Sequence, residues 1–240
     1  MTANRWSIPA LVGDPLAACF YEPRPRFLQG LTPADLESVM AAATPRRFLA
    51  NSVVTNQGEP ADHFFLLTKG CARHFTFTEE GRKVLLLWFS AGDVFGGSAL
   101  LPDPSCYLFG TEMVKDSSAF VWRGSVIRDL VARYPTLQQN ALSIASDYLA
   151  WFHASHLALV SYTARQRLGR VLTSLAQGIG HRVPGGIELD ITNEQLANAA
   201  NVTPFTASRL LSEWQRNGAV TKSRGRIVVH EPQRLFLQQA

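Results

Sequence analysis

The order of apolar and polar positions changes along the chain and predicts two kinds of structure. Between residues 46 and 123, short apolar or alternating runs are separated by turn-forming residues. Many short strands joined by glycine-containing turns predict a β-sandwich or a barrel-like roll. We expect strands at Phe48–Thr55, His63–Leu67, Ala72–Phe77, Val84–Phe89, Leu108–Met113 and Ser118–Trp122.

Helical spacing dominates on both sides of this region. Thr32 followed by Pro33 gives the start signal of a helix, a capping hydroxyl before a proline in the first turn. Apolar positions three and four residues apart predict further helices after residue 123. The expected helices cover 32–43, Ser125–Ala132, Pro135–Val160 and Thr163–Gln177.

The long helix expected over 135–160 carries two apolar stripes. One stripe consists of Leu142, Ala145, Leu149, Phe152, His156 and Leu159, and the other of Leu137, Ala141, Ile144, Tyr148 and Trp151. We interpret the first stripe as a seam with a second copy of the chain and the second as a contact with the strand region. A helix buried inside one domain would show the same pattern, so both interpretations stay open.

Two helix starts lie eleven residues apart near the C-terminus. Thr192 with Gln195 has the pattern of a capping box, and Thr203-Pro204 repeats the start signal. Only residues 200–202 separate the two helices, and Asn201 tolerates the left-handed conformation that a sharp turn requires. We expect one shared core made of Leu196, Ala197, Ala200, Val202, Ala207, Leu210, Leu211 and Trp214.

This core leaves small polar and basic residues on the outer face of the second helix. Those residues are Pro204, Phe205, Thr206, Ser208 and Arg209. A short helix, a tight turn and a second helix with such a face predict a helix-turn-helix that binds DNA. An ordinary pair of antiparallel helices is the alternative.

A basic hairpin is expected directly after these helices. Asn217-Gly218 ends the second helix, and two short strands follow, Ala219–Lys222 and Arg226–His230. The cations of this hairpin are Lys222, Arg224 and Arg226. Beside a recognition helix, such a hairpin predicts a wing that contacts phosphates, and a solvated basic surface is the alternative.

Positive charge is concentrated in the last third of the chain. Residues 164–240 hold ten Lys and Arg against five Asp and Glu, whereas the remainder holds 13 bases and 14 acids. The net charge of +4 for the whole chain therefore arises from this segment. Such a field favours polyanions and releases their condensed counterions on binding.

Length and composition indicate a globular protein in a reducing compartment. The 240 residues are 46% hydrophobic and 18% charged. Apolar runs are too short to span a bilayer and the N-terminus lacks a signal-peptide pattern, so we expect a cytoplasmic protein without a membrane partner. The scattered Cys19, Cys71 and Cys106 argue against a disulfide frame and against an iron–sulfur cluster.

Several local motifs follow one another in a family-specific order. They are Gly70 after a strand, Glu80-Gly81-Arg82 at a hairpin, Gly92-Asp93 before Phe95-Gly96, and Tyr134-Pro135 at the start of the long helix. With the helix-turn-helix and wing, they make residues 30–230 resemble the CRP/FNR family of bacterial transcription regulators, typified by the cyclic-AMP receptor protein and the fumarate–nitrate reduction regulator. The resemblance implies a sensor domain, a dimerising helix and a DNA-binding domain whose geometry an effector controls.

The resemblance also implies roles on the DNA side. The family commonly presents an arginine, a glutamate and, one turn on, another arginine to base edges, where this chain has Pro204, Phe205 and Arg209. Arg209 is thereby expected to contact guanine, whereas Phe205 can pack on a thymine methyl group, so the operator should differ. Thr192 and Asn193 match positions that touch phosphates. The implied partners are double-stranded DNA, a second copy of the chain and RNA polymerase.

The effector side departs from the cyclic-nucleotide members of the family. Their glutamate and arginine–serine pair fall on Gly97, Tyr107 and Leu108, and bulky residues stand where their long helix meets the adenine. Because a buried phosphate would lack a cation, we expect an effector other than cyclic AMP. A pocket filled by the protein's own side chains is the alternative. The candidate pocket residues are Gly96, Gly97, Ser98, Tyr107, Leu108, Phe152 and His153.

Histidines and cysteines raise a further alternative, a haem- or redox-sensing regulator. His153 lies three residues from His156, and His74 lies close to Cys71 in sequence. Without an evident third ligand, we expect structural histidines and neither metal nor haem. Cys106 lies in the loop between the candidate pocket residues Ser98 and Tyr107, where an inert thiol is the simpler interpretation.

A cupin-type metal enzyme is the alternative of another class. Its site needs two histidines that alternate on one strand and a third ligand, which His63 and His74 do not provide. We therefore predict no enzyme but a homodimeric, sequence-specific DNA-binding transcription regulator on a palindromic operator, with a hinge near Ser161–Thr163.

The expected fold class is α+β, with an N-terminal double-stranded β-helix (jelly-roll-like) sensor domain, a long dimerisation helix and a C-terminal winged helix-turn-helix. The predicted parts are an N-terminal extension (1–30), the β-roll sensor domain (31–134), the dimerisation helix with the hinge (135–162) and the DNA-binding domain (163–240).

Overall fold

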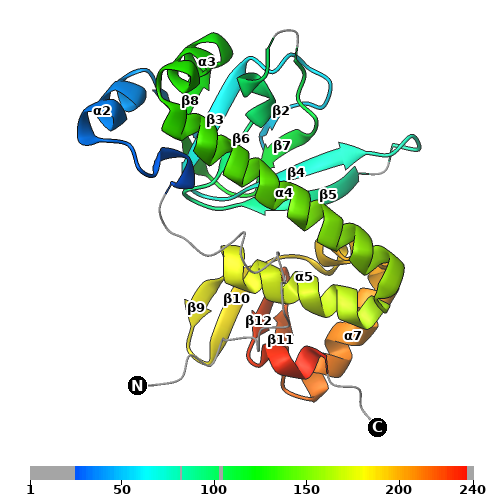
Figure 1. Cartoon of the computed structure of the whole chain (residues 1–240). Coiled ribbons are helices and arrows are strands. Elements are labelled where there is room, and N and C mark those ends of the chain that lie inside the picture. Colours follow the sequence, from blue (N-terminus) through cyan, green and yellow to red (C-terminus); the bar gives the residue numbers. More distant parts are fainter. Residues whose placement is uncertain (1–24, 82, 103–104, 237–240) are drawn as a thin grey trace. The chain divides into compact units, whose positions relative to one another are not determined.

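The computed structural model describes residues 25–81, 83–102 and 105–236 (Figure 1). These residues form two compact units, one ending at Ser146 and the other beginning at Asp147. The division falls inside the long helix α4 (Pro135–Ser161). Of the predicted extension over residues 1–30, all but residues 25–30 lies outside the described residues.

The first unit is rich in strands, as the alternating pattern predicts. Its elements before α4 are η1 (Arg26–Leu28), α2 (Pro33–Ala41), β1 (Thr44–Phe48), β2 (Val53–Thr55), β3 (His63–Lys69), β4 (Ala72–Phe77), β5 (Lys83–Phe89), β6 (Val94–Phe95), η2 (Gly97–Leu100), β7 (Gly110–Met113), β8 (Ser117–Arg123) and α3 (Gly124–Arg133).

Two four-stranded antiparallel sheets make up the β-roll of this unit, ordered β1-β8-β3-β6 and β2-β7-β4-β5 (Figure 1). Aromatic rings fill the space between them. Phe65 stacks on Phe95 in the first sheet with ring centroids 4.5 Å apart, and Phe89 of the second sheet lies 5.9 Å from Phe95. Sheet-on-sheet packing of this kind buries the inward-facing residues of both layers.

The single strand predicted over Phe48–Thr55 is wrong. The chain forms β1 and β2 instead, because Asn51 adopts a left-handed conformation at φ 62° and turns the backbone. The N–H of Ala50 donates to the Asp116 carboxylate over 2.9 Å and holds this turn. As a result, β1 pairs with β8 in one sheet and β2 pairs with β7 in the other.

Gly70 follows β3 at a place where only glycine fits. Its φ of 102° is strained for residues with a side chain, and a Cβ there would lie 2.7 Å from the Cα of Ser117. The close approach brings the chain reversal between β3 and β4 against the start of β8. The sequence motif at Gly70 thus has a steric cause.

A fully buried tryptophan attaches α2 to the roll. Trp122 of β8 donates its indole N–H to the Val39 carbonyl of α2 over 2.9 Å. The helix begins as predicted, because Thr32 caps it by accepting from the Asp35 N–H and Pro33 takes the first turn.

The second unit contains the end of α4 and a smaller mixed structure. Its further elements are α5 (Ala164–Ile179), β9 (His181–Val183), β10 (Gly186–Asp190), α6 (Asn193–Ala199), α7 (Pro204–Arg216), β11 (Val220–Ser223), β12 (Arg226–Val229) and η3 (Pro232–Leu235). The four strands form one antiparallel sheet in the order β11-β12-β10-β9. The pair of helices α6 and α7, followed by the hairpin of β11 and β12, agrees with the predicted winged helix-turn-helix.

The two apolar stripes of α4 differ in burial. In the stripe assigned to the roll, Leu137 and Ile144 are buried. In the stripe assigned to a second copy, Leu142 is 69% and Leu149 is 71% exposed, and Leu159 is also exposed. This uncovered face is apolar, yet none of the described helices is long and apolar enough to cross a membrane.

Candidate nucleic-acid interface

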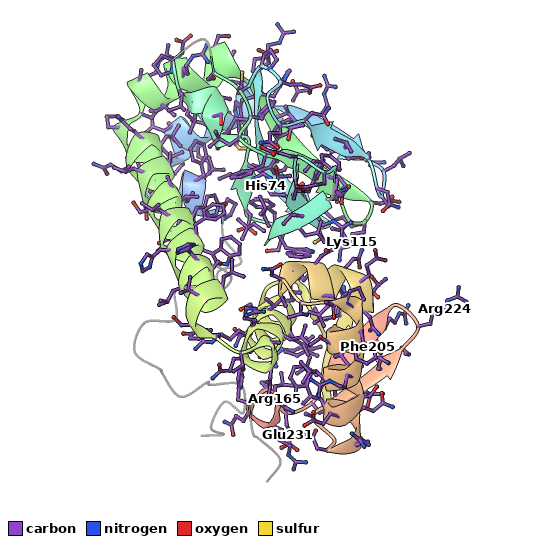
Figure 2. The ribbon with its side chains drawn as sticks, turned by 90° about the vertical axis from the view of Figure 1, so that its right-hand side faces the viewer. His74, Lys115, Arg165, Phe205, Arg224 and Glu231 are labelled. Carbon is purple, nitrogen blue, oxygen red and sulfur yellow. The ribbon has the colours of Figure 1, made fainter. Side chains whose placement is uncertain are left out.

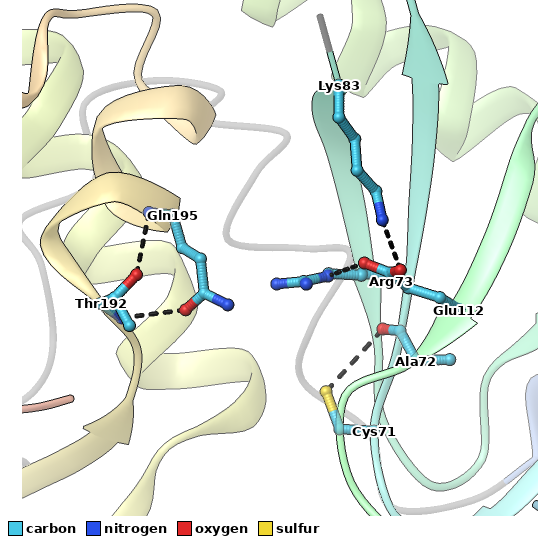
Figure 3. Close-up of polar contacts among 7 residues, drawn as sticks. All are labelled: Cys71, Ala72, Arg73, Lys83, Glu112, Thr192 and Gln195. Carbon is cyan, nitrogen blue, oxygen red and sulfur yellow. Dashed lines mark hydrogen bonds and ion pairs between the residues drawn. The ribbon is translucent and has the colours of Figure 1, made fainter. Parts of the chain in front are cut away.

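Helix α6 begins at the predicted capping box (Figure 3). The Thr192 hydroxyl oxygen accepts from the Gln195 N–H over 3.2 Å, and the Gln195 amide oxygen accepts from the Thr192 N–H over 2.9 Å. Two N–H groups that the first turn leaves unpaired are thereby satisfied. The box fixes where α6 starts and how the chain enters it from β10.

The turn between α6 and α7 depends on two residues. Asn201 takes the predicted left-handed conformation at φ 48°. Arg167 of α5 holds this turn in place, because its guanidinium donates to the carbonyls of Ala200 over 3.1 Å and Asn201 over 3.2 Å. The same guanidinium donates to the Tyr162 carbonyl over 2.8 Å. Sequence reasoning missed this role and counted Arg167 only as surface charge, since nothing in its neighbours indicates carbonyl partners.

Helix α7 starts with a second hydroxyl cap. Thr203 accepts from the Thr206 N–H over 3.1 Å, and the two hydroxyl groups are 2.9 Å apart. The predicted shared core of α6 and α7 is buried apart from Val202, which is half-buried. Its largest member, Trp214, is fully buried. Packing therefore fixes which side of α7 faces outward.

That outward side is the recognition face, which we define as Phe205, Arg209, Ser212 and Arg216. Their spacing of four, three and four residues places them along one side of the helix. All four side chains are exposed, and Phe205 is exposed by 78%. An apolar ring and two guanidinium groups are thus presented together to solvent.

The hairpin of β11 and β12 forms the predicted wing. Figure 2 shows Arg224 extending outward from its tip. Arg226 differs, because it lies 3.3 Å from Asp190 and 3.9 Å from Glu188 on the neighbouring strand β10. Its charge is partly compensated within the sheet, whereas Lys222 and Arg224 have no polar partner among the described residues.

Other cationic side chains of this unit form ion pairs with carboxylates of the same unit. Arg165 pairs with Glu213 of α7, where its hydrogen bond lowers the pKa of the carboxyl group, and Arg234 pairs with Glu231 over 2.7 Å. Within the described ranges, no hydrogen bond, ion pair or ring contact engages Arg182, Arg209, Arg216, Lys222 or Arg224, although Arg209 and Arg216 lie near enough to Glu213 to help lower its pKa. Most of them lie on the recognition face or the wing.

In the β-roll, Tyr107 occupies the position at which the resemblance implies a phosphate-binding arginine. Its hydroxyl donates to the His63 carbonyl and accepts from the His63 N–H, both over 3.0 Å. The Tyr107 side chain is buried, whereas its neighbour Leu108 is 67% exposed. Backbone bonds from Tyr107 to Gly58 and Glu59 hold the loop in this place.

Gly96 packs against His63, the residue to which Tyr107 is bonded. At its φ of 78°, a Cβ would lie 2.7 Å from the His63 carbonyl oxygen. Gly97 is exposed, and the Ser98 carbonyl accepts from the Ser105 hydroxyl over 2.9 Å. Gly96, Ser98 and Tyr107 are therefore brought into one loop cluster.

The remaining two candidate pocket residues, the half-buried Phe152 and the exposed His153, belong to the second unit. The pocket as a whole stays a prediction.

A half-buried histidine, His74, lies in the β-roll (Figure 2). His74 Nδ1 is 3.0 Å from the Thr111 hydroxyl, which itself accepts from Thr55 over 2.8 Å. The His74 ring contacts Phe89 and Phe109 with centroids 4.5 Å and 5.4 Å away. Burial lowers the pKa of His74 to about 4, so the imidazole is neutral at pH 7.

The second sheet also contains a cluster of ion pairs around Glu112. Glu112 bridges Arg73, over 2.6 Å, and Lys83 (Figure 3). Burial raises the pKa of Glu112 but the hydrogen bonds from both cations outweigh it, so the net shift is downward.

Cys71 is a buried thiol. Burial raises its pKa to about 12, which disfavours the thiolate that would bind a metal. The described residues contain no group of three potential metal ligands.

Comparison with protein families decides what these two units have in common with known proteins. Residues 45–134 match the cyclic nucleotide-binding domain family, and residues 166–236 match the Crp-like helix-turn-helix domain family. The two matches lie in the order that the sequence motifs indicate. The chain belongs to the CRP/FNR family of transcription regulators.

Individual relatives of this CRP/FNR regulator extend over most of its length. It is 21% identical over 214 residues to a CRP-like cAMP-activated global transcriptional regulator of Mycobacterium tuberculosis, covering 88% of this chain and 95% of the relative. It is 26% identical over 165 residues to the fumarate and nitrate reduction regulatory protein of Vibrio cholerae, covering 67% and 64%. FixK2 from Bradyrhizobium japonicum shares the fold, with a TM-score of 0.70 at 21% identity over 80% of this chain and 95% of that one.

Membership of this family bears on two predictions, that the protein is not an enzyme and that its fold class is α+β. The CRP/FNR regulators are DNA-binding transcription regulators and not enzymes, as the sequence predicts for this chain. The α+β fold class is confirmed as well, with a β-rich domain, a long helix and a helix-turn-helix with a small sheet. The roles of individual residues on the DNA and the effector side stay predictions.

Proposed function

We propose that this CRP/FNR regulator acts as a homodimer on a palindromic operator and responds to an effector other than cyclic AMP. The observation that carries the proposal is the recognition face, an exposed stripe along the second helix of a helix-turn-helix. The N-terminal residues of such helices meet base edges in the major groove. Arg209 can donate two hydrogen bonds to guanine from this position.

Residues around the recognition face contact the DNA backbone in this proposal. Thr192 and Asn193 lie at the start of α6, and Lys222 and Arg224 lie on the wing with their charges uncompensated among the described residues. Phosphate contacts of this kind orient a protein on the duplex without reading sequence. The complete proposed contact set is Thr192, Asn193, Thr203, Pro204, Phe205, Thr206, Ser208, Arg209, Lys222, Arg224 and Arg226.

The dimer is supported by the uncovered apolar face of α4. Leu142 and Leu149 lie seven residues apart, both more than two-thirds exposed. Ala145, His156 and Leu159 continue the exposed stripe, and Phe152 lies half-buried within it. A two-fold seam along α4 buries these side chains in a second copy. Two recognition helices then meet half-sites about 34 Å apart, one turn of the duplex.

The functional parts of the chain follow from this assignment. Residues 31–134 sense, residues 135–162 dimerise and residues 163–240 bind DNA. Only Tyr162 and Thr163 connect the end of α4 to the start of α5. Thr163 forms a capping box with Gln166, so a change in dimer geometry is passed to α5 through two residues. An effector would shift the population of such geometries.

Two side chains argue against cyclic AMP as that effector. Tyr107 stands where a cation would pair with the phosphate, and its hydroxyl is already bonded to His63 on both sides. Leu108, which stands in the adjoining serine position, is largely exposed. An anionic phosphate buried here would lack compensation, which is costly. The activation by cAMP named for the Mycobacterium tuberculosis relative therefore does not extend to this chain.

A second candidate is a regulator that needs no effector. The observation that favours it is the aromatic filling around His74, whose ring contacts Phe89 and Phe109 while its Nδ1 bonds to Thr111. A core already packed at normal density binds no ligand without rearrangement. The two candidates differ in whether the operator affinity depends on a removable small molecule.

One experiment tests the proposal and separates the candidates. The full-length protein, as purified, selects its operator from random duplexes, and we expect a palindrome with half-site centres about 10 base pairs apart. Operator affinity is then compared before and after stripping by reversible unfolding. A loss that an extract of small molecules restores supports an effector, and equal affinity supports the second candidate. Failure to enrich any sequence contradicts both.

A further inference from the structure

The most exposed large apolar side chain among the described residues is Phe205, at 78%. It occupies the second position of α7, directly after Pro204 and two residues after the capping Thr203. A single exposed apolar residue on a surface has no meaning by itself. Phe205, however, lies at the N-terminal end of α7, the helix that enters the major groove in the proposed function.

Phe205 takes part in neither the buried core nor the N-terminal cap of α7. The core side of the same helix turn is formed by the buried Ala207 and Leu210, and the cap is formed by Thr203 and Thr206 bonded to each other. Phe205 contributes to neither group. Its ring is therefore not required by the core or the cap of α7 and remains available to a partner.

We propose that Phe205 determines the sequence specificity of the proposed operator contact by packing on the C5 methyl group of thymine. The major-groove edge of a base pair offers one apolar group to a side chain, the thymine methyl, and a phenyl ring can neither donate nor accept a hydrogen bond. The inference rests on the proposed function, because it presumes that α7 enters the groove.

Helix geometry relates this methyl group to the guanine of Arg209. The two residues are four positions apart on the recognition face, about 6 Å along the helix axis. Base pairs are spaced about 3.4 Å apart. The thymine read by Phe205 thus lies within about two base steps of the guanine read by Arg209, in each half-site.

Removal of a single methyl group from the DNA tests the proposal directly. Each thymine of the selected operator is replaced in turn by deoxyuridine, symmetrically in both half-sites, and Kd is measured with the full-length protein. We expect one position within two base steps of a guanine to weaken binding by about fourfold per half-site, the factor for burying one methyl group. At the same position, 5-methylcytosine should bind more tightly than cytosine.

Variants identify the side chain that detects the methyl group. Phe205→Ala should abolish the difference between thymine and deoxyuridine, Phe205→Leu should retain part of it, and Arg209→Ala should leave it unchanged. Circular dichroism and thermal unfolding confirm that the Phe205 variants fold.

If an operator is found but no deoxyuridine substitution weakens binding, or if the effect persists in Phe205→Ala, the inference is overturned while the proposed function stands. If no operator is found, the proposed function fails first.

Discussion

The DNA-binding unit and the β-roll each match a domain family found in CRP/FNR regulators, yet they use their polar residues in opposite ways. In the DNA-binding unit, the helix caps and Arg167 satisfy backbone N–H and carbonyl groups around the helix-turn-helix. The side chains of Arg209 and Arg224 are exposed. In the roll, the polar groups of Tyr107 and His74 bond to the protein itself.

Because of this contrast, the family's function can be extended to this chain more readily for the DNA-binding unit than for the β-roll. An exposed arginine after a braced turn is available to a partner, whatever the remainder of the chain does. A hydroxyl that already bonds to His63 is not available to a ligand without a rearrangement that costs those bonds. We therefore propose that the DNA side follows the family in function, whereas the effector side follows it in fold only.

The largest expected effect concerns the helix that links the two units. Leu149→Glu should convert the dimer to a monomer, because a carboxylate would be buried at the seam at a cost of about 3 kcal/mol or more, about a hundredfold or more in association. Sedimentation velocity measures the change. Leu49→Glu is the matched control, since Leu49 is 75% exposed and lies outside α4. An unchanged sedimentation profile for Leu149→Glu would move the interface elsewhere.

The next effect belongs to the DNA-binding unit. Arg209→Ala should weaken operator binding by about 1–3 kcal/mol and relax the preference at one base position. Fluorescence anisotropy on the operator and its single-position variants checks both. Arg182→Ala removes an exposed arginine of β9 and should change neither. A uniform loss over all sequences would assign Arg209 to the phosphates instead.

The roll should respond to pH through His74. Its pKa of about 4 lies below the ordinary 6.5, so the unfolded chain takes up the proton first as pH falls. The stabilisation is complete above pH 6.5 and is lost between 6.5 and 4, by about 2 kcal/mol at pH 4.5. Urea unfolding at pH 7 and 4.5 should show this loss in the wild type and in the control His181→Asn. An equal loss in His74→Asn would refute the assignment.

The smallest effect concerns the contribution of the wing arginines to DNA affinity. Arg224→Ala should weaken binding by about 0.5–1 kcal/mol on every sequence and reduce the slope of log K against log salt by about 1. Arg226→Ala should reduce the slope less, because Asp190 already compensates that charge. Equal slopes for both variants would mean that the ion pair opens in the complex.

Much of the fold could be predicted because its signals are local. The capping box at Thr192 and the left-handed Asn201 are encoded within a few residues, and both are confirmed. The strand over 48–55 was wrong because Asn51 turns the chain inside an otherwise apolar run. The two-residue strand β6 was too short to give an alternating pattern.

The site could be predicted only where side chains remain on the surface. Phe205 and Arg209 follow from helix periodicity, which fixes the outward face. The contacts of Arg167 with Ala200 and Asn201, and of Tyr107 with His63, could not be predicted, because these partners lie 33 or more residues away in the sequence. Long-range bonds of this kind leave no mark in local spacing.

The proposal that this regulator reads DNA as its family does but does not respond to cyclic AMP can be tested at the operator. Its most direct test is one titration of the selected operator, performed with and without millimolar cyclic AMP on the stripped full-length protein. We predict isotherms that coincide at every protein concentration. A shift to tighter binding in the presence of the nucleotide would contradict the account.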